Sequence, residues 1–139
     1  MSETPFSLLA AFRATHYRVY LDDTIITLRI GRFSGPLALL HARCMVSSSA
    51  FLTAFNPCAT LCGVDANRTA QGLLSSRIDA MGLSRLDGVA CDPDRKWPDE
   101  PSLLVLGITR DQACALAREF RQRAIVFTDE RALPALVFL

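Results

Sequence analysis

Hydrophobic and polar positions follow two different periods along the first half of the chain. Apolar residues recur at helical spacing over 6–12, directly after Pro5, which suits the first position of a helix. Residues 17–30 alternate with a period of two and are interrupted by Asp22–Asp23, which is typical of a β-hairpin. A further alternating run at 50–55 predicts a third strand.

A long helix is predicted over 65–81. Apolar residues repeat on one face of this range, and Gly82 supplies a stop signal. Gly72 lies inside the helix, where glycine costs about 1 kcal/mol relative to alanine. We therefore expect another part of the chain to approach Gly72 closely. The polar residues 87–101, rich in aspartate and proline, predict a loop.

Strand, helix and strand follow one another from Ser102 to Phe127. The run 102–108 is apolar on both faces, as expected of a strand that is covered on both sides. Thr109 and Gln112 have the spacing of a capping box, and the helix that they open leads to the strand at 124–127. This order predicts a βαβ unit with a right-handed crossover.

The pattern as a whole predicts an α+β fold in a single globular domain spanning residues 1–139. Its mixed β-sheet combines the N-terminal antiparallel hairpin with the C-terminal βαβ unit, and helices pack on it. A chain of 139 residues, of which 50% are hydrophobic, can bury a substantial core. The final apolar stretch, ALVFL, predicts a strand with an open edge, which can pair with a second copy of the chain.

Charge and composition limit the partners to be considered. The formal net charge of +1 gives no general attraction for nucleic acid polymers or anionic membranes. The first residues lack the basic start and apolar core of a signal peptide, and no apolar run approaches the roughly 18 residues of a membrane span. Five irregularly spaced cysteines indicate reduced thiols. We expect a cytoplasmic protein that does not contact a membrane.

Two asparagines flank the connection between the strand at 50–55 and the long helix. Asn56 precedes Pro57, which disfavours helical backbone at Asn56, and an Asn-Pro pair is common in turns. Asn67 falls in the first turn of the helix. Strand ends that face helix N-termini often bind ligands, and amides beside helix N–H groups can hold an anion or a base edge. A turn and a ligand site are both open interpretations.

Three more residues are candidates for a site. Trp97 precedes a buried strand, where it serves either as an anchor over the core or as a stacking surface for a ligand. Glu100 comes next and can act as an acid–base group if the loop shields it. Gln122 ends a helix, where it bonds the last carbonyls or points into the crevice. A solvated face of that helix is predicted for Arg110, Arg118 and Arg121.

The cysteines carry weaker signals. Cys58 and Cys62 are close in sequence, but zinc sites need about four ligands, and His16 and His41 lie far along the chain. A cysteine nucleophile paired with either histidine has no local signature here. We expect no metal and no cofactor, and Cys44 and Cys114 are predicted to belong to the core.

Four sequence blocks occur in a recognisable order: FLTAFNP, then Asn67, then WPDEPSLLVLG, then LAREFRQRAIVF. From about Tyr17 to its end, the chain thereby resembles a bacterial family catalogued as domain of unknown function 3293. The resemblance implies no known activity. It implies that five residues form one recurring set: Asn56, Asn67, Trp97, Glu100 and Gln122.

Three functions follow from these observations. The first is binding of a small polar or nucleotide-like ligand in a strand-end pocket lined by the five residues. The second is a small hydrolase or transferase with Glu100 as general base. The third is a protein-interaction module, such as a homodimer formed through the C-terminal strand, without catalytic activity.

Overall fold

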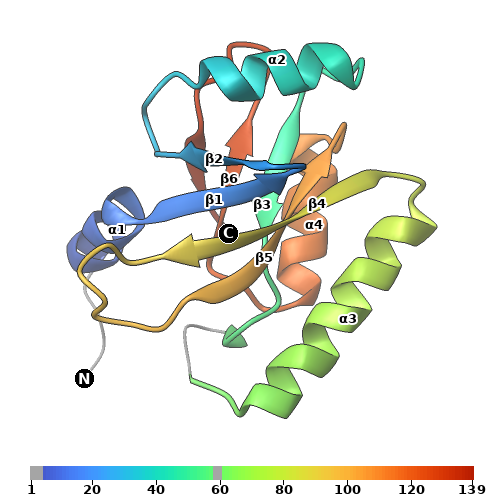
Figure 1. Ribbon diagram of the computed structural model, residues 1–139. Coiled ribbons are helices and arrows are strands. Elements are labelled where there is room, and N and C mark those ends of the chain that lie inside the picture. The colour runs from blue at the N-terminus through green and yellow to red at the C-terminus, as the bar shows by residue number, and fades with distance from the viewer. Residues whose placement is uncertain (1–4, 58–60) are drawn as a thin grey trace.

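The computed structural model describes residues 5–57 and 61–139, and within these ranges it has four helices and seven strands (Figure 1). The helices are α1 (Pro5–Ala14), α2 (Gly35–Arg43), α3 (Val64–Ala80) and α4 (Arg110–Glu119). The strands are β1 (His16–Leu21), β2 (Thr24–Leu28), β3 (Ser49–Leu52), β4 (Ser84–Cys91), β5 (Glu100–Leu106), β6 (Ala124–Thr128) and β7 (Ala135–Phe138). The predicted α+β class is confirmed.

All seven strands belong to one sheet, in the order β2-β1-β4-β5-β3-β6-β7. The sheet differs from the expected mixed one because each pair of neighbouring strands is antiparallel. The predicted βαβ unit is present in a split form. Its strands β5 and β6 run in the same direction, but β3 lies between them and is antiparallel to both.

Strand β4 occupies part of the segment that was predicted to be a loop. Only residues 92–99 connect β4 to β5. The strand was missed because it carries polar residues on exposed positions and contains Gly88, both of which weaken a strand pattern. Gly88 marks a close approach of β1, since a β-carbon there would lie 2.6 Å from the carbonyl oxygen of Arg18. The expectation for Gly72 was wrong, because a β-carbon there would meet nothing within 4 Å.

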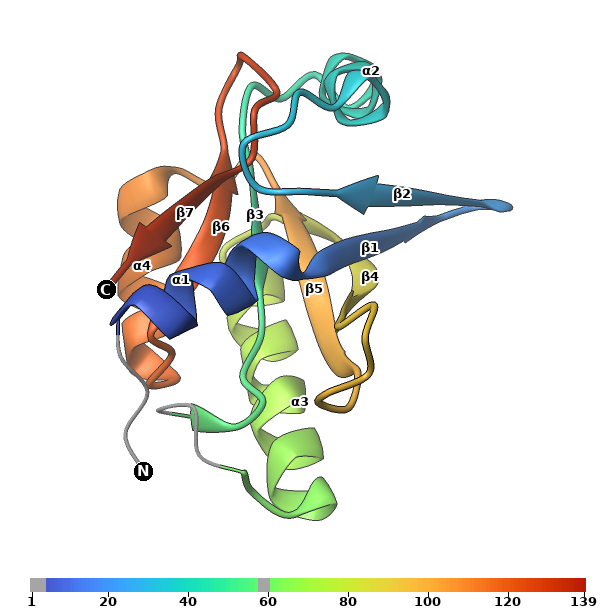
Figure 2. The same cartoon turned by 90° about the vertical axis from the view of Figure 1, so that its left-hand side faces the viewer.

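Two apolar clusters lie on opposite faces of the sheet. Helices α3 and α4 cover one face, where Leu74 and Ile78 of α3 are buried against strand residues such as Val105. Helix α2 covers the other face and buries residues that include Leu37 against Phe51. Figures 1 and 2 show α3 and α4 on one side of the sheet and α2 across its upper part.

Helix α1 packs near the edge strand β7. The rings of Phe12 and Phe138 meet edge to face, with centroids 6.2 Å apart, and the Tyr17 hydroxyl donates a 3.1 Å hydrogen bond to the Phe12 carbonyl oxygen. Figure 2 shows α1 running from β7 towards β1. The antiparallel hairpin of β1 and β2 turns at Asp22 and Asp23, as predicted. Pairing of β7 with a second chain stays a prediction.

No helix in the ranges 5–57 and 61–139 has both the length and the apolar character needed to cross a membrane.

Four element ends gather at one end of the sheet, in the lower half of Figure 1. They are the exit of β3, the start of α3, the start of β5 and the connection from α4 to β6. This arrangement brings together residues that are up to 66 positions apart in the sequence, from Asn56 to Gln122.

Candidate functional site

Asn56 and Asn67 bind each other through two hydrogen bonds. The Asn56 backbone N–H donates to Asn67 Oδ1, and Asn67 Nδ2 donates to Asn56 Oδ1, both at 2.9 Å. The Cys62 N–H also donates to Asn56 Oδ1 at 3.0 Å, and Asn67 Nδ2 approaches the Cys62 carbonyl oxygen at 3.4 Å. The two asparagines thus face each other across the connection between β3 and α3. Asn67 is buried and uses both ends of its amide for this purpose.

Local sequence explains how each asparagine reaches its place. Asn56 has a φ of 48°, in the left-handed region that asparagine tolerates better than most residues, and Pro57 disfavours the right-handed helical alternative. On α3, Asn67 lies on the same face as Leu74 and Ile78, which are both buried. Its side chain is therefore directed towards the sheet.

The chain from Thr53 to Asn56 leaves the sheet, and side chains take over its backbone hydrogen bonds. The Ala54 N–H donates to Gln71 Oε1 at 2.8 Å, and the Phe55 N–H donates to Thr53 Oγ1 at 3.0 Å. Gln122 Nε2 donates to the Phe55 carbonyl oxygen at 3.1 Å. Buried backbone groups need such partners where a strand ends. Gln122 thus holds the peptide immediately before Asn56.

Gln71 is a site residue that the sequence interpretation missed. It follows Asn67 by four positions on α3, and this spacing alone places both amides on one side of the helix. The need of the Ala54 N–H for an acceptor fixes the orientation of the Gln71 amide. Its Nε2 is then buried, without a hydrogen-bond partner in the described part of the chain.

Glu100 lies at the outer end of this network of amides. It is the first residue of β5, it is half-buried, and its carboxyl group is hydrogen-bonded by the Asn56 side chain. Since Asn56 Oδ1 already accepts two hydrogen bonds, Asn56 Nδ2 is the donor to Glu100. Burial raises the pKa of the Glu100 carboxyl above its ordinary value, and the hydrogen bond from Asn56 offsets part of this increase.

Tyr17 lies in the same row of the sheet as Glu100. Cross-strand pairing aligns Tyr17 with Ala90 and Ala90 with Glu100, so the tyrosine and the carboxylate occupy the same face. Burial raises the pKa of the Tyr17 phenol, and the negative charge of Glu100 adds to the increase. Tyr17 belongs to the predicted hairpin, and its relation to Glu100 depends on a strand order that the sequence pattern did not reveal.

Trp97 is less closely connected to the candidate site than the other predicted residues are. It is half-buried in the loop 92–99, three positions before Glu100. The ring contacts found in the described ranges join other aromatic residues, Phe12 with Phe138 and Tyr17 with Phe51. A role for Trp97 in stacking on a ligand stays a prediction.

The cysteines and histidines adopt arrangements that the sequence did not predict. Cys58 lies outside the described residues, and the described ranges contain no group of three or more His, Cys, Asp or Glu side chains that could hold a metal ion. Cys114 is buried as predicted, but the core prediction for Cys44 was wrong, because Cys44 follows the last turn of α2 and is exposed there. His16 pairs across the sheet with Cys91. Burial raises the pKa of the Cys91 thiol, and so does the carboxylate of Asp99, which is opposite to the activation that a thiolate nucleophile needs.

His41 forms a second unexpected pair. Its Nε2 lies 2.8 Å from Ser49 Oγ, and both residues are buried, with exposed fractions of 5% and 0%. Although histidine and serine can form a nucleophile–base pair, this one is closed to a substrate. The hydrogen bond between His41 and Ser49 joins α2 to the start of β3.

A model of one protein family, described as "Protein of unknown function (DUF3293)", matches residues 52–125. The matched range is more than half of the chain and contains all five of the predicted site residues. The resemblance inferred from the four sequence blocks is therefore confirmed. No curated protein and no solved structure matches the chain.

Proposed function

The chain belongs to the DUF3293 family, and since that family carries no assigned activity, we propose from the geometry that the protein binds a small polar ligand at the strand end, with Glu100 as the contacting group. One observation carries the proposal. The Glu100 carboxyl group is half-buried, has a raised pKa and is held by the amide of Asn56. Perturbed carboxyl groups of this kind are concentrated at functional sites.

The amides have different roles in this proposal. The amide of Asn67 is occupied by Asn56 and Cys62, and that of Gln122 by the backbone of α4 and of the chain before Asn56. They are positioning residues that fix Asn56. Asn56 in turn fixes the carboxyl group of Glu100, and such prior orientation reduces the entropic cost of binding.

The chemistry of Glu100 indicates the class of ligand. An ionised carboxylate accepts hydrogen bonds, whereas the neutral form, favoured by the raised pKa, also donates one. A ligand with adjacent donors and acceptors, such as the edge of a nucleobase or an amide, matches both states. Trp97 lies in the adjacent loop and offers an aromatic face to the same ligand.

A second candidate is a hydrolase or transferase in which Glu100 is the general base. The raised pKa of its carboxyl favours this function, because a base works best when its pKa is near the working pH. The two functions differ in one result. An enzyme would convert a ligand that the protein binds, and Glu100→Gln would abolish the conversion, with a smaller effect on binding.

A thermal-shift screen of the purified protein against nucleotides, nucleosides, amino acids and sugar phosphates tests the proposal. A ligand present at about 100 times its dissociation constant adds about 2.7 kcal/mol to the free energy of unfolding, which is readily seen in the Tm. The stabilisation should be lost in Glu100→Gln and in Asn56→Ala. It should persist in the control Glu130→Gln, which removes the charge of an exposed glutamate.

Two results would contradict the proposal. If a ligand stabilises Glu100→Gln as strongly as it stabilises the original protein, that ligand binds elsewhere. A well-folded protein that responds to no compound in the panel would instead support a protein partner.

A further inference from the structure

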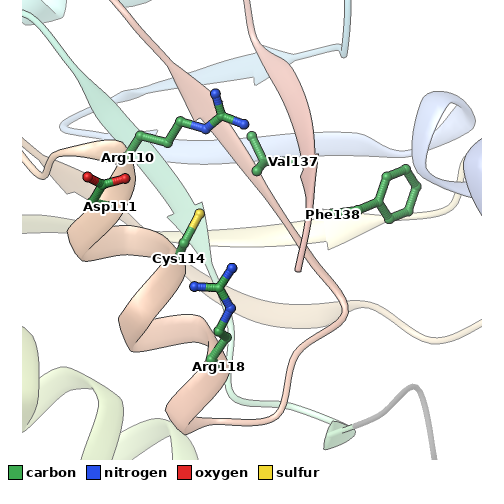
Figure 3. Close-up of a pocket in the computed structure, with 6 residues that line it drawn as sticks. All are labelled: Arg110, Asp111, Cys114, Arg118, Val137 and Phe138. Carbon is green, nitrogen blue, oxygen red and sulfur yellow. The ribbon is translucent and has the colours of Figure 1, made fainter.

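A cavity of about 360 Å³ lies between α4 and β7 (Figure 3). It is lined by Arg110, Asp111, Cys114, Arg118, Val137 and Phe138. We call it the α4–β7 groove. Its volume is within the range of small-molecule sites, roughly 300–1,000 Å³. None of the five predicted site residues lines it, so it is a second site.

One face of α4 forms a wall of the groove. Arg110, Cys114 and Arg118 are spaced by four residues and therefore lie along the same side of the helix. Cys114 is small and buried between them, which leaves space between the two longer side chains. Figure 3 shows the Arg110 guanidinium extending towards Val137 and the Arg118 guanidinium on the Cys114 side of its helix.

The predicted solvated face of α4 agrees with the structure, in which Arg110, Arg118 and Arg121 are all exposed. Arg110 and Arg118 line the groove, whereas Arg121 does not and follows the helix with a φ of 58°. The groove itself was not predicted, because the sequence interpretation considered α4 alone. The edge strand β7, which supplies the opposite wall, comes later in the chain and lies beside this helix only in the folded protein.

The groove carries an excess of positive charge. In the part of the chain that the structure describes, the ion pairs belong to Arg77, Arg85 and Arg131, so Arg110 and Arg118 have no carboxylate within salt-bridge distance there. Against these two guanidinium groups, the lining contains a single carboxylate, that of Asp111. A bound anion could therefore accept hydrogen bonds from these guanidinium groups without displacing an ion pair.

The opposite wall is apolar. Val137 and Phe138 come from β7. Val137 packs on the same face of the sheet as Cys114 of α4, whereas the Phe138 ring is directed to the other face, against Phe12 of α1 (Figure 3). Val137 therefore gives this wall an apolar surface that a ligand can cover.

We propose that the α4–β7 groove binds a small organic anion, with its carboxylate or phosphate group between Arg110 and Arg118 and its apolar part against Val137. Guanidinium groups donate paired, charge-assisted hydrogen bonds to both kinds of anion. Asp111 repels a second negative group at the start of α4 and accepts a hydrogen bond from a hydroxyl or amine. The groove therefore selects compounds with one anionic end.

The test is an NMR titration of the full ¹⁵N-labelled chain with phenyl phosphate, benzoate, inorganic phosphate and neutral benzyl alcohol. Phenyl phosphate, benzoate or both should cause saturable shifts of amide signals from residues 110–118 and 135–138. Inorganic phosphate should bind more weakly than phenyl phosphate, and benzyl alcohol should not saturate. The difference between the two aromatic anions identifies the preferred charged group.

Single substitutions separate the two parts of the groove. Arg118→Gln should weaken the binding of the aromatic anion about tenfold or more, which is the usual effect of losing a charge-assisted hydrogen bond. Val137→Ser should reduce the advantage of phenyl phosphate over inorganic phosphate. Arg43→Gln changes an exposed arginine on α2 and should leave both affinities unchanged, as should Glu100→Gln at the strand end.

Three results would overturn the proposal. They are the absence of saturable shifts with any anion, equal binding of benzyl alcohol, and unchanged affinity in Arg118→Gln. Since Arg118 is exposed, that variant is expected to fold, and the dispersion of its NMR spectrum verifies this.

Discussion

Asn56 and Asn67 form a closed ring of two hydrogen bonds, each 2.9 Å long: the Asn56 backbone N–H donates to Asn67 Oδ1, and Asn67 Nδ2 donates to Asn56 Oδ1. The ring joins the exit of β3 to the first turn of α3. Asn67 is buried, so water cannot readily replace either bond. The ring holds Asn56 at a positive φ, and from this position the Asn56 side chain reaches Glu100. Local backbone geometry and the environment of the carboxyl group are thus coupled.

Asn56→Ala and Asn67→Ala are expected to be strongly non-additive. Each single substitution leaves buried partners unsatisfied and should lower the free energy of unfolding by about 1–3 kcal/mol. Because both remove the hydrogen bond between Asn67 Nδ2 and Asn56 Oδ1, the double variant should lose less than the sum, by about 0.5–3 kcal/mol. Urea denaturation of the four proteins measures this coupling.

The matched control for this cycle pairs Asn67→Ala with Thr109→Ala. Thr109 caps α4 through Gln112 and shares no partner with the asparagines, so these two losses should add. Additive losses for Asn56 and Asn67 themselves would mean that they are independent turn residues.

Much of this site could be predicted because its signals are local. An amide before proline, a second amide in the first turn of a helix and a glutamate at the start of a strand can be recognised from their neighbours in sequence. The hairpin, α3 and α4 follow from hydrophobic periodicity for the same reason. Asn56 lies just after β3 and Asn67 lies in the first turn of α3, so both belong to the same connection between two elements.

The remaining features depend on contacts between distant segments. The insertion of β3 between β5 and β6 is a matter of strand order, which the pattern of one strand does not encode. Tyr17 and Glu100 share a row only because β4 lies between their strands. Likewise, the α4–β7 groove forms where an edge strand lies beside a helix, and the sequence of neither element predicts this contact.

Because of the buried pair of His41 and Ser49, the free energy of unfolding should decrease at acidic pH. Burial lowers the pKa of His41, so the unfolded chain binds its proton first as the pH falls below about 6.5. The contribution of His41 to the free energy of unfolding is therefore fully present above this pH, and it is lost as the pH falls towards the lower pKa of the folded state. The free energy of unfolding, measured by urea denaturation between pH 7.5 and 5, should decline less in His41→Gln.

His16→Gln is the control for this effect, because His16 is the other histidine and also has a lowered pKa. Its substitution should leave the His41 contribution in place. At pH 7.5, Ser49→Ala should cost about 1–3 kcal/mol by removing a buried hydrogen-bond partner. An unchanged pH dependence in His41→Gln would show that His41 does not titrate with unfolding.

Two glycine-to-alanine substitutions should act in opposite directions. Gly72→Ala places its methyl group in open space within α3 and should stabilise the protein by up to about 1 kcal/mol. Gly88→Ala forces a methyl group against the Arg18 carbonyl oxygen and the Phe51 ring, and should cost about 1–3 kcal/mol. Thermal unfolding of both variants measures the difference, and a neutral Gly88→Ala would show that β1 and β4 can separate without cost.

Glu100 should impose the opposite pH dependence from His41. Burial raises the pKa of its carboxyl, so the unfolded chain releases this proton first as the pH rises above about 4.3. The contribution to stability is therefore fully present below that pH and is lost as the pH rises through the folded-state pKa. Glu100→Gln should lack this decline and should be at least as stable as the original protein at pH 7, whereas the exposed control Glu130→Gln should retain it.

Asn56→Ala links this titration to the ring of hydrogen bonds. The Asn56 side chain lowers the pKa of Glu100, so its removal should move the titration to higher pH. Carboxyl ¹³C NMR of Glu100 measures the shift directly in the folded protein, independently of the stability that Asn56→Ala loses. A Glu100 titration that stays at the same pH in this variant would separate the carboxyl group from the amides, and would remove Asn56 as its positioning residue.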